Sequence, residues 1–215
     1  MKYVVIVSGG MDSVTLLGHL RAQGHTLRVL SFDYGQRHKR ELTYARRVCK
    51  AWSIPHRVVD LTTLTPLLNR SALTGKTKVP HGHYEAPSMK LTVVPNRNMI
   101  MLAVAIGYAE NLQYDAVAIA NHAGDHAIYP DCRPEFIDAL DRASQVGTYQ
   151  AIKLHAPFVA LTKGEIAKIG LQLGVDYDRD TYSCYEGKVI HCGKCGTCVE
   201  RTQALAFAKG VSNEP

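Results

Sequence analysis

The chain has 215 residues and a net charge of +6, and its contents of 46% hydrophobic and 20% charged residues are ordinary for a globular protein. No apolar run approaches the roughly 20 residues of a membrane-spanning helix, and the first apolar run meets Gly9 and Gly10 too soon to be a secretory signal. We therefore expect a cytoplasmic protein without a membrane partner. A basic chain attracts nucleic acid, ATP or acidic small molecules, but no basic block is interleaved with aromatic residues, so stable nucleic-acid binding is not expected.

Short apolar runs alternate with amphipathic stretches along the chain. Strands are expected at residues 3–7, 27–32, 55–60, 116–120 and 152–154, and helices from residue 14 and over 41–52, 96–112, 134–146 and 163–173. This alternation predicts a doubly wound α/β fold, in which a mainly parallel five-stranded sheet carries helices on both faces. We predict that residues 1–175 form this domain and that residues 176–215 form a small C-terminal zinc-binding region.

Ligands of such sheets bind beyond the carboxyl ends of the strands, which brings residues 8–13, 33–36 and 121–131 to one edge. Residues 62–92 interrupt the alternation, because they are rich in Thr, Lys, His and Pro and only weakly periodic. Loops of this length are usually lids or disordered segments. We expect a lid over the substrate, and the alternative is a mobile surface excursion.

The segment Ser8-Gly9-Gly10-Met11-Asp12-Ser13 joins the first strand to the first helix. Paired glycines permit a sharp turn with exposed N–H groups, and the helix N-terminus adds a partial positive charge. The two serines add hydroxyl donors, and Asp12 can hold Mg²⁺. A Walker loop is excluded because Arg70 stands where its first glycine belongs before Gly75-Lys76-Thr77. All six residues are candidates for binding ATP phosphates, and an ordinary strand-to-helix turn is the alternative.

Four of the six cysteines lie close together near the C-terminus: Cys184, Cys192, Cys195 and Cys198. These spacings let four thiolates converge on one tetrahedral ion, and Gly193 and Gly196 permit tight turns between them. Four ligands close the coordination shell, so we expect a structural Zn²⁺ that helps a short segment to fold. His191 is a possible substitute ligand. An iron–sulfur cluster and unrelated free thiols are the alternatives.

The residues of the 8–13 loop resemble the pyrophosphate-binding loop of the N-type ATP pyrophosphatases, which have an adenine nucleotide alpha hydrolase-like fold. Further motifs follow in order along the whole chain, at residues 32–38, 94–98, 129–136, 181–185 and 191–198. With these motifs the chain resembles the 7-cyano-7-deazaguanine synthases, a narrower group within that superfamily. The resemblance implies a homodimer that works with ATP, Mg²⁺ and a structural Zn²⁺.

The resemblance also implies a reaction on 7-carboxy-7-deazaguanine, whose product feeds queuosine or related 7-deazaguanine modification of nucleic acid. ATP adenylates the substrate carboxylate, and ammonia displaces AMP to give an amide. A second ATP activates the amide oxygen, and loss of AMP leaves the nitrile. Each activation releases pyrophosphate, which the 8–13 loop would hold while catalysis proceeds by positioning and charge stabilisation.

Asp12, Ser13, Arg97 and Lys163 are the candidate catalytic residues. Asp12 would orient Mg²⁺ or a phosphate-bound water. Arg97 would pair with the substrate carboxylate or a phosphate, and a helix-end salt bridge is the alternative. Lys163 would contact a phosphate, unless it is an exposed helix lysine. Phe32 and Tyr34 would frame the adenine, although Phe32 suits the core equally well.

Gln36, Arg97, Asp125, Asp131 and Arg133 are the candidate substrate contacts. A carboxylate at residue 125 or 131 would accept hydrogen bonds from guanine-like donors, and the alternative for Asp131 is to cap the following helix.

The chain departs from the family in two places. Asn96 replaces the usual glycine of the 94–98 motif, although asparagine tolerates many glycine conformations. Before Tyr129 the family usually has an Asn, an Asp and a Ser-Gly pair, whereas this chain has Asn121-His122-Ala123-Gly124-Asp125-His126-Ala127-Ile128. Because this loop is altered, an enzyme that stops at 7-amido-7-deazaguanine is an alternative. Two rivals remain, a tRNA thiolase with the same loop and a non-enzymatic zinc module that binds nucleic acid.

Overall fold

The computed structural model describes residues 1–83 and 86–211. Five parallel strands form one sheet in the order β3-β2-β1-β4-β5. The strands are β1 (Lys2–Ile6), β2 (Thr26–Asp33), β3 (His56–Asp60), β4 (Ala116–Ala118) and β5 (Lys153–His155). Val5 at the centre of the sheet pairs with Val29 on one side and Ala118 on the other. The predicted doubly wound α/β fold is confirmed.

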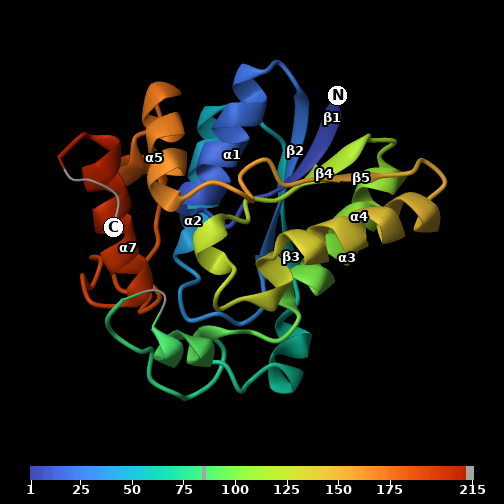
Figure 1. The fold of residues 1–215 in the computed structure, drawn as a ribbon. Helices are drawn as coiled ribbons and strands as arrows, with labels where there is room; N and C mark the ends of the chain where they lie inside the picture. The colour runs from blue at the N-terminus through green and yellow to red at the C-terminus, as the bar shows by residue number, and fades with distance from the viewer. Residues whose placement is uncertain (84–85, 212–215) are drawn as a thin grey trace.

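Helices cover both faces of this sheet (Figure 1). They are α1 (Met11–Ala22), α2 (Glu41–Ala51), α3 (Arg97–Asn111), α4 (Pro134–Gly147), α5 (Lys163–Gln172), α6 (Tyr177–Asp180) and α7 (Gly196–Ala208). Helices α1, α2, α5 and α7 pack on one face, and α3 and α4 pack on the other. Sequence analysis predicted a metal site in the C-terminal segment from the spacing of its cysteines, but it did not predict helices α6 and α7.

Strand β1 separates two hydrophobic cores. Tyr3 and Val5 point to the core beneath α1 and α5, whereas Val4 and Ile6 point to the core beneath α3. Successive residues of a strand face opposite sides of the sheet, so a strand buried on both faces must be apolar throughout. This explains the unbroken apolar run that precedes the glycine pair.

The order in which the chain adds strands to the sheet changes direction between β1 and β4, although all the strands stay parallel. From β1 the chain continues to β2 and β3 on one side, and later to β4 and β5 on the other. In open parallel sheets the crevice at such a switch point, outside the carboxyl ends of the strands, is the usual ligand site. Here that crevice lies between the loop after Ile6 and the segment after Ala118, where β4 ends two residues earlier than predicted.

The 62–92 segment packs against the body through buried Ala72, Leu73 and Met89 and contains two 3₁₀ helices, η1 (Thr62–Leu67) and η2 (Pro87–Thr92). His81 forms an isolated antiparallel bridge with Cys195 of the C-terminal segment. Residues 84–85 of the expected lid and 212–215 of the predicted C-terminal region lie outside the described residues. The lid and the division near residue 175 stay predictions.

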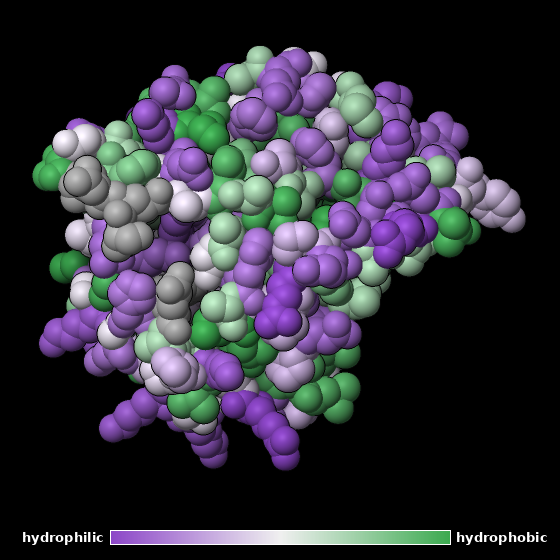
Figure 2. Space-filling view, viewed as in Figure 1, coloured by the Kyte–Doolittle hydropathy of each residue, from purple (hydrophilic) through white to green (hydrophobic). Residues whose placement is uncertain are grey.

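Hydrophilic and hydrophobic side chains are interspersed over the face shown in Figure 2. Within residues 1–83 and 86–211, every helix is too short or too polar to cross a bilayer.

Candidate active site

A cavity of about 200 Å³ occupies the crevice between β1 and β4. Ten residues that sequence analysis singled out line it: Ser8, Gly10, Met11, Asp12, Ser13, Phe32, Tyr34, Arg97, Asp125 and Lys163. They come from five separate segments of the chain, which the sheet topology brings to one place. Convergent polar groups in a concave site at the switch point are the usual features of a ligand pocket.

The 8–13 loop is held in shape by its own hydrogen bonds. Gly10 N donates to Ser8 Oγ at 3.1 Å, Gly9 N donates to Ser13 Oγ at 3.3 Å, and the two hydroxyls lie 3.1 Å apart. Gly9 has φ 100°, and a Cβ at this position would collide with the Glu41 carbonyl. Helix α1 then begins at Met11 without a side-chain cap. The N–H groups of its first turn lack intrahelical acceptors and therefore suit an anion.

Asp12 and Lys163, which both line the cavity, form a largely buried ion pair. Lys163 Nζ lies 3.2 Å from Asp12 Oδ2 and 2.7 Å from Glu200 Oε2, and the lysine side chain is only 10% exposed. The alternative of an exposed helix lysine is therefore wrong. Burial by itself raises the pKa of Asp12, but the charges of Lys163 and His122, together with hydrogen bonds to the carboxylate, outweigh burial, and the net effect lowers that pKa. Burial alone would lower the pKa of Lys163, but the nearby carboxylates, chiefly those of Asp12 and Glu200, together raise it above its ordinary value. The ion pair therefore persists at neutral pH.

Asp12 also has a carboxylate oxygen that is available to a ligand. Its Oδ1 atom is buried and has no hydrogen-bond partner. An unpaired buried carboxylate oxygen is costly unless a ligand satisfies it. His122 Nε2 lies 3.6 Å from Asp125 Oδ1 and 3.9 Å from Asp12 Oδ2, so a second carboxylate is close by. Carboxylate oxygens and phosphates are the ligands that Mg²⁺ prefers, and the residues present fit that ion.

Arg97 and Tyr34 also line the cavity. Arg97 Nη1 lies 3.5 Å from Tyr34 Oη and the guanidinium carbon lies 5.9 Å from the ring centre. Burial raises the pKa of Tyr34 to about 12, so it stays a neutral phenol. Among the described residues no ion pair involves Arg97, and the alternative of a helix-end salt bridge is not observed. Phe32 belongs to a core cluster and also lines the cavity, so both of its predicted roles are compatible.

Asn96, for which the resemblance implies a glycine, precedes helix α3 with φ 55° and ψ 25°. This left-handed conformation favours glycine and is tolerated by asparagine. The substitution therefore keeps the backbone turn that delivers Arg97 to the cavity wall.

Four predicted site residues do not line the cavity: Gly9, Gln36, Asp131 and Arg133. The amide of Gln36 is used internally, because it donates to Phe32 O and accepts from Tyr34 N. Asp131 Oδ2 accepts from Asn98 N at 2.8 Å, so this carboxylate caps the first turn of α3, whereas Arg133 occupies the N-cap position of α4. The alternative prediction, that Asp131 caps the helix that follows it in the chain (α4), is therefore wrong. Arg133 is exposed and donates to His126 O.

Several cavity residues received no role from sequence analysis. His38 and Glu41 lie 3.4 Å apart at the end near Tyr185, and burial raises the pKa of Glu41 to about 8 and lowers that of His38 to about 3. His38 and Tyr185 belong to the motifs at residues 32–38 and 181–185, which gave a signal without a role. Glu200, the partner of Lys163, had no local signal at all.

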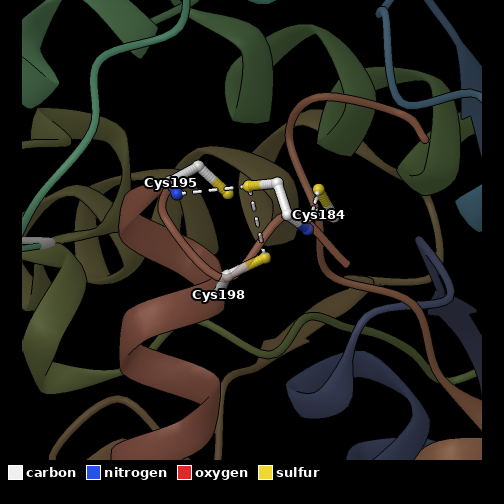
Figure 3. Close-up of side chains that lie close together, drawn as sticks. Cys184, Cys195 and Cys198 are labelled. Atoms are coloured by element: carbon white, nitrogen blue, oxygen red, sulfur yellow. Dashed lines mark hydrogen bonds between the residues drawn. The ribbon is translucent and has the colours of Figure 1, made fainter. Parts of the chain in front are cut away.

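The four clustered cysteines form a second centre. Their sulfurs all lie within 4.8 Å of one another, and Cys192 Sγ is 3.9 Å from Cys198 Sγ. Sulfurs held at about 2.3 Å from one tetrahedral ion are about 3.8 Å apart. In Figure 3 the sulfurs of Cys184, Cys195 and Cys198 turn toward one space beside the start of α7. The cluster can therefore bind a metal ion such as zinc.

Backbone donors support the cysteine cluster, since Lys194 N and Cys195 N both donate to Cys192 Sγ. Gly193 has φ 68°, as a tight turn requires, but Gly196 is the first residue of α7, and its predicted turn is wrong. His191 accepts a hydrogen bond from Ser183 N and does not belong to the sulfur cluster.

Comparisons with known proteins agree over nearly the whole chain. Residues 2–209 match the sequence profile of the family described as queuosine biosynthesis protein QueC. A 7-cyano-7-deazaguanine synthase of Marinobacter nauticus is 52% identical over 98% of this chain and 94% of its own length. A protein of the same name from Hahella chejuensis is 50% identical over 100% of this chain and 91% of its own length.

Solved structures show the same fold at low identity. NMN synthetase from Francisella tularensis aligns with a TM-score of 0.55 and 14% identity over 98% of this chain and 78% of its own. The NH3-dependent NAD synthetase from Campylobacter jejuni aligns with a TM-score of 0.51 and 16% identity, over 82% of this chain and 66% of its own. At such identities the likeness concerns the fold alone.

Proposed function

The chain belongs to the queuosine biosynthesis protein QueC family, and on that basis we propose that it is an ATP-dependent carbon–nitrogen ligase. The proposed reaction converts 7-carboxy-7-deazaguanine and ammonia to 7-cyano-7-deazaguanine, with an adenylated acid and an amide as intermediates. The observation that carries this proposal is the sequence identity of 52%, over 98% of the chain, to a relative named 7-cyano-7-deazaguanine synthase. The cavity at the switch point supplies groups for each part of the reaction.

The carboxylate oxygen of the substrate attacks the α-phosphorus of ATP, and the bond to the β-phosphate breaks. We assign the departing pyrophosphate to the glycine turn and the first turn of α1, where hydroxyls and N–H groups face the cavity. Lys163 would balance charge on the phosphates, and Asp12 would hold Mg²⁺, which neutralises developing negative charge when bound. Ammonia then attacks the acyl carbon, and AMP leaves with the former carboxylate oxygen.

A second adenylation would activate the amide oxygen. Loss of AMP and of the amide protons then leaves a carbon–nitrogen triple bond. Arg97, which lines the same cavity and has a planar fork, would orient the carboxylate and then the amide of the substrate. Tyr34 and Phe32 would frame the adenine ring.

The cysteine cluster would hold Zn²⁺ in a purely structural role, since four thiolates leave no open position. We also propose a homodimer, on the resemblance alone. Family membership argues against a tRNA thiolase and against a non-enzymatic zinc module.

His122 and Asp125 from the unusual 121–128 run line the cavity, which keeps 7-amido-7-deazaguanine as a second candidate product.

The test is incubation of the purified protein with 7-carboxy-7-deazaguanine, ATP, Mg²⁺ and ammonium, followed by mass spectrometry. We expect amide, nitrile, AMP and pyrophosphate. Nucleotide released as ADP would refute adenylation, and a product that stops at the amide would support the second candidate. Asp12→Ala should abolish AMP formation and leave the far-UV circular dichroism spectrum and zinc content unchanged.

A further inference from the structure

Glu200 forms an ion pair with Lys163, the lysine that we propose contacts the phosphates. Its Oε2 lies 2.7 Å from Lys163 Nζ, against 3.2 Å for Asp12 Oδ2. The Glu200 side chain is 14% exposed, so water screens this pair little. The carboxylate also sits closely against neighbouring residues, since a Cβ on Gly124 would lie 3.3 Å from its Oε1.

Helix α7, which carries Glu200, is anchored at its start by the cysteine cluster. Cys195 is its N-cap residue and Cys198 lies in its first turn. One turn further on, Arg201 Nη1 donates to Thr181 Oγ1 at 2.7 Å and Arg201 Nη2 to Tyr177 O at 2.6 Å. These contacts fix both the axial position and the rotation of α7. The location of the Glu200 carboxylate therefore depends on these contacts in the C-terminal segment as well as on the core into which α7 packs through Ala204.

The two carboxylates that contact the Lys163 ammonium come from helices that are far apart in the sequence. Asp12 stands in the first turn of α1, Lys163 begins α5, and Glu200 comes from α7. With Glu200 removed, Asp12 would remain as the nearby anion, and the ammonium would move onto the carboxylate that is proposed to hold Mg²⁺. Because Glu200 shares the ammonium with Asp12, the Asp12 carboxylate does not neutralise it alone, and Asp12 Oδ1 has no hydrogen-bond partner.

We propose that Glu200 is a positioning residue for ATP, which holds the Lys163 ammonium at the phosphate site and leaves Asp12 available to the metal ion. This inference rests on the proposed ATP-dependent function. It gives the cysteine-anchored segment a part in nucleotide binding in addition to any contribution to folding.

The test is a double-mutant cycle on ATP affinity, measured by calorimetry with Mg²⁺ present and without the 7-deazaguanine substrate. The variants are Glu200→Gln, Lys163→Gln and the double variant, with the exposed Glu135→Gln on α4 as the matched control. Glutamine keeps the length of glutamate and loses its charge. Far-UV circular dichroism and zinc per chain are recorded for each variant.

We expect Glu200→Gln to keep its fold and zinc and to weaken ATP binding about tenfold, as loss of a charged hydrogen bond does. In the Lys163→Gln background the same change should alter affinity less than about twofold, because the group on which it acts is gone. Glu135→Gln should bind ATP like the unmodified protein. A purely structural glutamate would weaken binding equally in both backgrounds.

Unchanged ATP affinity in Glu200→Gln, or penalties that multiply in the double variant, would overturn the proposal. If Glu200→Gln loses zinc or helical signal, Glu200→Asp replaces it in the same cycle, because aspartate keeps the charge and shortens the reach. Failure of the ligase function is read separately, as absence of AMP from the unmodified protein with 7-carboxy-7-deazaguanine. The binding cycle needs no turnover and decides on Glu200 alone.

Discussion

Gly9→Ala tests whether the 8–13 loop, which we propose binds phosphate, depends on its close approach to helix α2. At Gly9 a Cβ would overlap the Glu41 carbonyl oxygen and lie 2.9 Å from its carbon and 3.0 Å from Ala45 N, against 3.4 Å for ordinary contact. The neighbours are backbone atoms, so the loop itself must retreat by at least 0.5 Å, the difference between 3.4 and 2.9 Å. The left-handed φ costs about 1–2 kcal/mol, and the steric overlap adds about 1–3 kcal/mol.

Gly24→Ala is the matched control, because Gly24 also has a left-handed φ, of 75°, but no atom within 4 Å of a Cβ. Urea denaturation should show a loss of about 2–5 kcal/mol in unfolding free energy for Gly9→Ala and about 1 kcal/mol for Gly24→Ala. Calorimetry should show that only Gly9→Ala loses ATP affinity, because the displaced loop carries the N–H donors away from the cavity. Equal unfolding free energies and equal ATP affinities in the two variants would refute the reasoning.

Two further predictions concern titration and metal. Burial raises the pKa of Glu41 to about 8, so the folded protein keeps a proton that the unfolded chain has lost above its ordinary value of 4.5. Between these values stability must fall with rising pH, by up to about 1.4 kcal/mol per unit. Glu41→Gln should remove this part of the pH dependence in denaturation curves from pH 5 to 8, and an unaltered curve would contradict the assignment. Cys195→Ser should lower zinc per chain, measured by atomic absorption, and then solubility. Cys49→Ala, in the core beneath α2, should keep its zinc, and equal zinc loss in both variants would argue against the sulfur site.

Local patterns in the sequence were sufficient for the fold class and for two centres. Strand β1 could be predicted because both its faces are buried, which requires an unbroken apolar run. The glycine pair could be recognised because a sharp turn must follow the strand. The four cysteines could be recognised as a possible metal site because they lie close together in the sequence. In each case the physical cause acts over a few consecutive residues, so the residues themselves display it.

Other assignments depended on which segments meet in space. Asp131 precedes α4 in the chain yet caps α3, and the side chain of Gln36 turns inward to backbone groups near its own strand. Glu200 carries no signal in the sequence, and Phe32 proved to be both core and cavity wall. Hydrogen-bonding partners of such side chains are set by packing and not by neighbours along the chain.

By itself the sequence determined the alternation of strands and helices, the glycine turn after β1 and the set of four clustered cysteines, because these follow from local periodicity and spacing. Only the tertiary structure decided that Asp12, Lys163 and Glu200 from three helices share one buried cluster. An ion pair of that kind needs chain segments far apart in sequence to be packed at fixed distances, and no local pattern encodes those distances.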